Sequence, residues 1–153
     1  MAHITTWLDE RRELGVLFIR LFMSTFLIYM SQDNVFDRAR MVEFERFLRQ
    51  FGFPLPLLSA HVSVYAQLAC AILILLGAFT RVAATVMVVN FVVALAMVHT
   101  RLPFREALDP SAMLAGALFL LVHGPGVPSV DEWRKRRSVT RARTAPRELQ
   151  QLR

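Results

Sequence analysis

Four apolar stretches divide the chain, and polar segments separate them. The central two, Leu57–Phe79 and Val82–Val98, are interrupted only by Thr80 and Arg81. At about 1.5 Å per residue, each stretch is long enough to cross most or all of a hydrocarbon layer about 30 Å thick. The gap leaves room only for a tight reversal, in which Gly77 can end the first helix and Thr80 can cap the second. We therefore predict a transmembrane helical hairpin.

One further apolar stretch lies on each side of the hairpin. The first, Leu14–Met30, would be about 26 Å long as a helix. The last, Ser111–Val122, is shorter. Asp109 and Pro110 suit a helix start, as the N-cap and the first helical residue; alternatively, the helix begins near Phe104 and is kinked at Pro110. The pattern predicts an all-α integral membrane four-helix bundle.

The polar segment Ser31–Pro56 contains a fifth helical pattern. Apolar side chains recur there at helical spacing, and charged side chains cover the remaining face. These apolar residues are Met41, Phe44, Leu48 and Phe51. We predict a short helix between the first two membrane helices, which lies at the extracytoplasmic membrane surface or caps the bundle.

Charge is concentrated at the C-terminal end. Ten basic and eleven acidic residues precede residue 134, whereas residues 134–153 contain eight basic residues and one acidic residue. A basic tail after a membrane domain favours anionic lipid as its partner, rather than nucleic acid. We expect three segments: an interfacial lead-in over residues 1–13, a four-helix transmembrane domain over 14–131, and a disordered, basic cytoplasmic tail over 132–153.

Four membrane crossings place both termini on the same side. If that side is the cytoplasm, eleven basic residues lie inside and six outside, as the positive-inside rule requires. We therefore predict cytoplasmic N- and C-termini. The single cysteine, Cys70, excludes an intrachain disulfide framework.

Polar side chains within the apolar stretches are candidate functional residues, because they are costly to place in a bilayer. Residue counts from the hairpin turn put His61 and His99 at the same outer level, with Tyr65 one turn below His61. Gln67 and Asn90 lie near mid-membrane by the same count. The candidate binding residues for a quinone or a lipid are Arg20, His61, Tyr65, Gln67, Asn90 and His99.

Several interpretations of these residues stay open. His61 and His99 could contact a quinone head group or ligate a b-type haem. We favour a third interpretation, in which both are interface residues stabilised by water and loop carbonyls. Haem ligation is the interpretation that we favour least. Two histidines without a third ligand predict no metal site. Arg20 either extends to the inner interface or is held within the bundle. Gln67 and Asn90 are of a kind that often joins helices. No catalytic residue is assigned.

Several short motifs together resemble the DoxX family of small four-helix bacterial membrane proteins. They are Arg20 in the first helix, FGFPLP at 51–56, LLGAFTR at 75–81, His99 at the end of the third helix, and GPGVPSVD at 124–131. The resemblance implies a compact bundle in the bacterial inner membrane. It also implies association with redox systems such as quinol oxidase, thiosulfate:quinone oxidoreduction and oxidative-stress complexes.

One departure from the family pattern bears on whether this chain is itself catalytic. Members commonly carry a glutamate ten residues before the turn glycine, where this chain has Gln67. The resemblance then implies that Arg20 lacks its carboxylate partner, which favours a non-catalytic accessory subunit among other membrane subunits. The alternatives are a quinone-reactive oxidoreductase subunit that uses Arg20, His61 and His99, and a purely structural or lipid-binding membrane protein.

Overall fold

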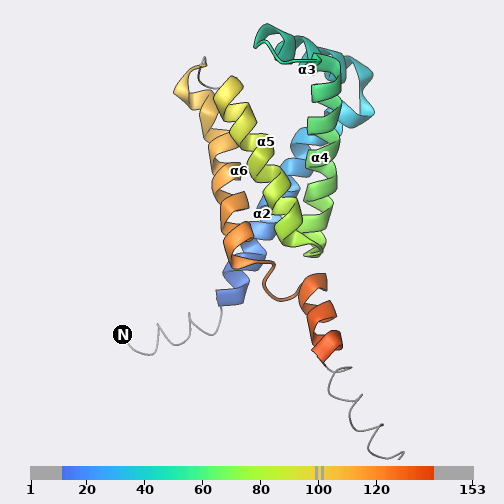
Figure 1. Ribbon diagram of the computed structural model, residues 1–153, viewed down its shortest axis with the longest axis vertical. Helices are drawn as coiled ribbons and strands as arrows, with labels where there is room; N and C mark the ends of the chain where they lie inside the picture. Colours follow the sequence, from blue (N-terminus) through green and yellow to red (C-terminus); the bar gives the residue numbers. More distant parts are fainter. Residues whose placement is uncertain (1–11, 99, 101, 140–153) are drawn as a thin grey trace, which may run out of the picture.

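The protein folds into a bundle of membrane-spanning helices. The computed structural model describes residues 12–98, 100 and 102–139 (Figure 1). Four of its helices are long and apolar enough to cross a membrane: α2 (Arg12–Phe36), α4 (Pro56–Leu76), α5 (Thr80–Met97) and α6 (Phe104–His123). The predicted all-α four-helix membrane fold is confirmed.

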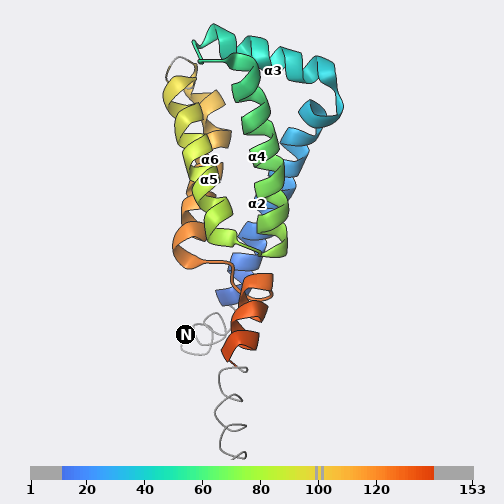
Figure 2. The same ribbon diagram turned by 45° about the vertical axis from the view of Figure 1, so that its right-hand side comes forward.

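A fifth helix, α3 (Arg38–Gln50), lies across one end of the bundle (Figure 2). Asp37 caps its N-terminus, and its carboxylate accepts a hydrogen bond from the backbone N–H of Ala39 at 2.8 Å. Met41 and Leu48 are buried against α4. The short helix expected between the first two membrane helices is therefore confirmed.

Two helix boundaries differ by more than two residues from the sequence-based prediction. Helix α2 continues beyond Met30 as far as Phe36. Helix α6 begins at Phe104, so Asp109 lies within the helix and is not its N-cap. Residues 104–108 are compatible with a helix, and the helix passes through Pro110 without ending there. The alternative start near Phe104 was the right one.

Small residues let the four membrane helices approach closely. Helix α2 packs mainly against α4, and α5 packs against α6. Ala71, Ala84 and Ala117 are fully buried where these helices meet. Gly116 of α6 lies directly against Met23 of α2. A Cβ added to Gly116 would lie 2.5 Å from the Met23 sulfur. Large apolar side chains cover the outer faces, as expected for lipid contact.

Residues 130–139 form a further helix at the end of the bundle where α2 begins (Figures 1 and 2). Glu132 and Arg136 form an ion pair at 3.3 Å along it, and the Arg137 guanidinium lies 3.8 Å from the ring centroid of Trp133. The predicted boundary at residue 131 therefore falls inside a helix, and the first part of the predicted disordered tail, up to residue 139, is helical. Residues 140–153, and the predicted lead-in up to residue 11, lie outside the described residues.

Candidate functional site

Arg20 lies at the centre of the bundle end that carries the α4–α5 turn and the loop of residues 124–129, which we call the junction. The side chain is only 2% exposed. The Nε and Nη2 atoms donate to the carbonyls of Ile74 and Leu75 at 3.0 and 2.9 Å. Nη1 donates to the carbonyls of Pro125 and Pro128 at 2.9 and 2.7 Å. One buried cation thus joins α2 to the last turn of α4, where carbonyls lack helical partners, and to the loop.

Gly77 makes this close approach possible. It ends α4, as predicted, with a positive φ of 65°. An added Cβ would lie 2.5 Å from the Ser129 Cβ and 2.6 Å from Nη2 of Arg20. Both the backbone conformation and the available space therefore require glycine at this position.

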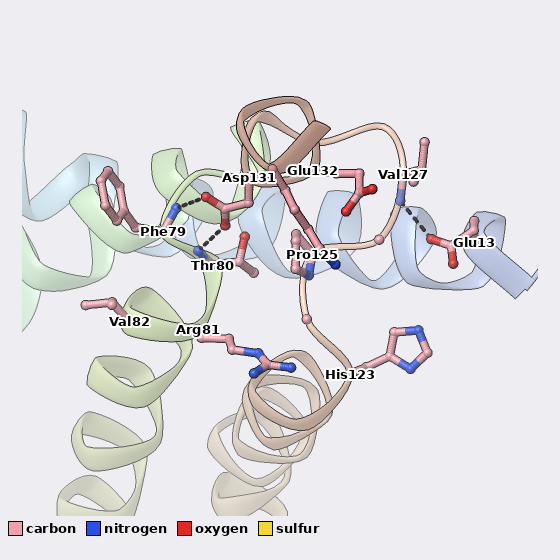
Figure 3. Close-up of a pocket in the computed structure, with 13 residues that line it drawn as sticks. Glu13, Phe79, Thr80, Arg81, Val82, His123, Pro125, Val127, Asp131 and Glu132 are labelled. Carbon is pink, nitrogen blue, oxygen red and sulfur yellow. Dashed lines mark hydrogen bonds between the residues drawn. The ribbon is translucent and has the colours of Figure 1, made fainter. Parts of the chain in front are cut away.

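The N-terminus of α5 is capped from a distant part of the chain. The two carboxylate oxygens of Asp131 accept hydrogen bonds from the backbone N–H groups of Phe79 and Thr80, each at 2.9 Å (Figure 3). The prediction that Thr80 caps this helix is wrong, because Thr80 is its first residue and is fully buried. A carboxylate at the positive end of the helix dipole is favourable.

Glu13 ties the same loop to the beginning of α2. Its Oε2 atom accepts a hydrogen bond from the backbone N–H of Val127 at 2.8 Å (Figure 3). Together with the bonds of Arg20 and Asp131, this contact fixes the loop to α2, α4 and α5. Arg20 and the motifs at 75–81 and 124–131 therefore meet in the junction, where they hold the helix ends together. The roles of Glu13 and Asp131 were not predicted, and the motif at 124–131 was the only signal for Asp131.

A second feature, which we call the apolar pocket, lies in the half of the bundle nearer α3. It has a volume of about 500 Å³, and side chains from all five labelled helices line it. Its wall includes five phenylalanines: Phe26, Phe44, Phe47, Phe53 and Phe91. The pocket therefore suits a hydrophobic ligand.

Gln67 and Asn90 form a polar cluster in the wall of the apolar pocket, with Ser63 between them. The Ser63 hydroxyl donates to Oδ1 of Asn90 at 2.9 Å, and Nε2 of Gln67 donates to the Ser63 hydroxyl at 3.1 Å. Within the described part of the chain, Oε1 of Gln67 and Nδ2 of Asn90 have no hydrogen-bond partner. The cluster therefore offers a ligand both a free acceptor oxygen and free amide N–H donors.

The other predicted binding residues do not line this pocket. Nδ1 of His61 lies 2.8 Å from the carbonyl of Leu57 on the same helix, and Tyr65 is half exposed with its ring 6.1 Å from that of His61. Arg20 contacts α4 about two helical turns beyond Gln67. His99 lies outside the described residues.

The structure thus brings together Gln67 and Asn90 from the predicted set and places Arg20 in the junction. Arg20 donates its hydrogen bonds to four backbone carbonyls. A carboxylate at position 67 would therefore not be its partner. Within the described ranges, no group of three or more histidine, cysteine, aspartate or glutamate side chains is arranged to hold a metal ion.

Comparison with known proteins gives one match. The family model described as DoxX matches residues 15–100, which include nearly all of α2 and the whole of α3, α4 and α5. The match ends before the 124–129 loop and before Asp131. No curated protein and no solved structure matches the chain.

Proposed function

This chain belongs to the DoxX family, and on that premise we propose that it is an accessory subunit of a quinone-linked redox complex in the bacterial inner membrane. The redox association follows from what the family resemblance implies. Cytoplasmic termini, predicted from the distribution of basic residues, are part of the proposal. The subunit would contribute a binding pocket to its complex while other subunits carry out electron transfer.

The apolar pocket is the observation that carries this proposal. Its volume of about 500 Å³ lies in the range of small-molecule sites. Phenylalanine and aliphatic side chains suit a flat ring, and the free amide atoms of Gln67 and Asn90 suit a carbonyl or hydroxyl on that ring. A quinone presents acceptors and a quinol presents donors, so the pair could bind either form.

The chemistry of the pocket favours binding rather than reaction. Amide side chains such as those of Gln67 and Asn90 do not exchange protons near neutral pH, so they are poor acid–base catalysts. Among the described lining residues, Asp109 is the one side chain that titrates as an acid or base, and it makes no hydrogen bond to the amide cluster. Arg20 and His61, which the quinone-reactive alternative requires, do not line the pocket. We therefore assign ligand retention to this subunit and no chemical step.

Purification of the full chain in mild detergent tests the proposal. We expect solvent extraction to recover a quinone, and we expect membrane redox subunits to co-purify. Gln67→Leu and Asn90→Leu should each lower the recovered quinone about fivefold, which corresponds to a loss of about 1 kcal/mol of binding free energy.

Thr85→Val is the matched control, since Thr85 lies on α5 but faces outward and bonds only to the Arg81 carbonyl. This variant should retain the wild-type quinone content. Extraction of phospholipid alone from the wild-type protein would instead support a purely structural or lipid-binding role. Equal quinone content in Gln67→Leu and the wild type would remove the pocket from the proposal.

A further inference from the structure

The junction contains a second pocket that the redox proposal does not use. This junction pocket has a volume of about 550 Å³ and lies between the start of α5, the end of α6 and the helix of residues 130–139 (Figure 3). Charged side chains of both signs line it. They are Glu13, Arg81, Asp131, Glu132 and Lys135, and His123 also contributes to the wall.

The three acidic side chains of the junction pocket already have partners. Glu13 and Asp131 accept hydrogen bonds from backbone N–H groups, and Glu132 pairs with Arg136. The two cationic side chains, Arg81 and Lys135, have much weaker hydrogen-bond partners or none. Arg81 makes one long contact, from Nη2 to the Val122 carbonyl at 3.4 Å. The three carboxylates and two cations give the lining a formal charge of −1, but Arg81 is a cation without a strong partner in the described part of the chain and can therefore bind an anion.

Lys135 is the second cation available to an anion, because its ammonium group has no hydrogen bond or ion pair within the described part of the chain. Figure 3 shows the Arg81 guanidinium extended across the end of α6 toward His123. Arg81 and Lys135 come from different elements but line one pocket, as the two sides of an anion site would.

A buried hydroxyl in the same wall also lacks a partner. Thr80 is fully buried, and its Oγ1 is the buried side-chain polar atom for which the described structure supplies no hydrogen bond. Such an atom costs stability unless something satisfies it. In Figure 3 the Thr80 side chain points to the side of the pocket where Asp131 and Glu132 lie. A ligand oxygen in the pocket would provide the missing partner.

We propose that the junction pocket binds the phosphate of a membrane phospholipid head group, with Arg81 and Lys135 as its cationic contacts and the Thr80 hydroxyl as a further donor. Arginine and lysine form strong charge-assisted hydrogen bonds with phosphate. This inference is independent of the proposed redox function, since it concerns the opposite end of the bundle from the apolar pocket.

The surroundings of the junction pocket favour a lipid over free phosphate. The pocket lies where the membrane spans end, which is the depth of phospholipid head groups. Val82 lines the pocket and is 61% exposed, and Val122 beside it on α6 is 79% exposed. Acyl chains attached to a bound phosphate could therefore run down the outer surface of α5 and α6.

Thermal unfolding of the full chain in detergent tests this proposal with four probes: phosphatidylethanolamine, phosphatidylglycerol, diacylglycerol with the same acyl chains, and inorganic phosphate. We expect both phospholipids to raise the melting temperature and diacylglycerol to leave it unchanged. The double variant Arg81→Gln, Lys135→Gln should weaken phospholipid binding about tenfold. Arg137→Gln removes a nearby charge outside the pocket and should weaken binding less than about twofold.

Several results would overturn the proposal. Equal protection by diacylglycerol would exclude phosphate recognition, and equal protection by inorganic phosphate would exclude the lipid as its source. If Arg137→Gln lost as much phospholipid binding as the double variant, the binding would reflect general charge attraction and not recognition by the pocket.

Thr80→Val tests the hydroxyl separately. We expect it to retain the melting temperature of the lipid-free protein, because no bond is lost, and to show a smaller shift on addition of phospholipid. An unchanged shift would exclude Thr80 from the site.

Discussion

At the scale of single residues, the most informative side chain is Arg20. A cation inside a membrane protein often indicates a functional site. Here its hydrogen bonds go to four backbone carbonyls at the ends of two chain segments. The carbonyls of Ile74 and Leu75 lie at the C-terminal end of α4 and carry partial negative charge, so they stabilise the buried guanidinium, and the nearby Asp131 carboxylate adds coulombic attraction. Arg20 is therefore a structural residue.

Replacing Arg20 by methionine should destabilise the protein by on the order of 3 kcal/mol or more, because several buried carbonyls lose their donor at once. Arg20→Lys should recover only part of this loss, since an ammonium group cannot match the planar guanidinium fork. Unfolding in detergent with increasing denaturant measures both effects. Arg105→Met is the control, because Arg105 is exposed near the opposite end of the bundle. Wild-type stability in Arg20→Met would contradict the structural role.

Gly77 and Gly15 provide a matched pair of glycines. Gly77→Ala places a Cβ into Ser129 and Arg20 at a positive φ, so we expect a loss of more than about 2 kcal/mol. Gly15 lies in α2 with no atom within 4 Å of an added Cβ, so Gly15→Ala should stabilise the protein by up to about 1 kcal/mol. Melting temperatures of the two variants should therefore move in opposite directions. A similar shift for both would contradict the geometry of the α4–α5 turn.

At the scale of elements, hydropathy and helical spacing predicted most of the fold. The membrane helices and α3 could be recognised because each buries an apolar face that repeats along the chain. The cap of α5 could not, since Asp131 lies 51 residues from the Thr80 N–H that it binds. Local sequence rules search for caps within one turn of the helix. The same limit applies to α6, where Asp109 and Pro110 resemble a helix start but lie inside the helix.

Asp131→Ala should lower the stability of the whole bundle by about 1–2 kcal/mol, because two N–H groups at the start of α5 lose their acceptor. The comparison variant is Asp37→Ala, which removes the cap of α3 alone. Hydrogen exchange of backbone amides distinguishes the two. Asp131→Ala should increase exchange at the α4–α5 turn and in the 124–129 loop, and Asp37→Ala should do so in the first turn of α3. Increased exchange confined to residues after 131 would contradict the long-range cap.

At the scale of the whole molecule, the two ends of the bundle have different roles. The junction uses its charged residues to hold helix ends together and contains a pocket lined by charges of both signs. The half nearer α3 contains the apolar pocket with its amide cluster. Residue counting from the hairpin turn predicted a similar depth for Gln67 and Asn90, and the structure links them through Ser63. The pocket itself could not be predicted, because it depends on how five helices pack.

The most direct test of the proposed function uses two neighbouring valines of α5. The two side chains are similarly exposed, at 47% for Val92 and 40% for Val93, but only Val93 lines the apolar pocket. A phenylalanine at position 93 should fill ligand space, and the same change at position 92 should only alter the outer surface. The measurement is the quinone retained per protein after purification in mild detergent. We predict that Val93→Phe loses most of its quinone and that Val92→Phe retains the wild-type amount. Equal retention by both variants, or no quinone in the wild-type protein, would contradict the account.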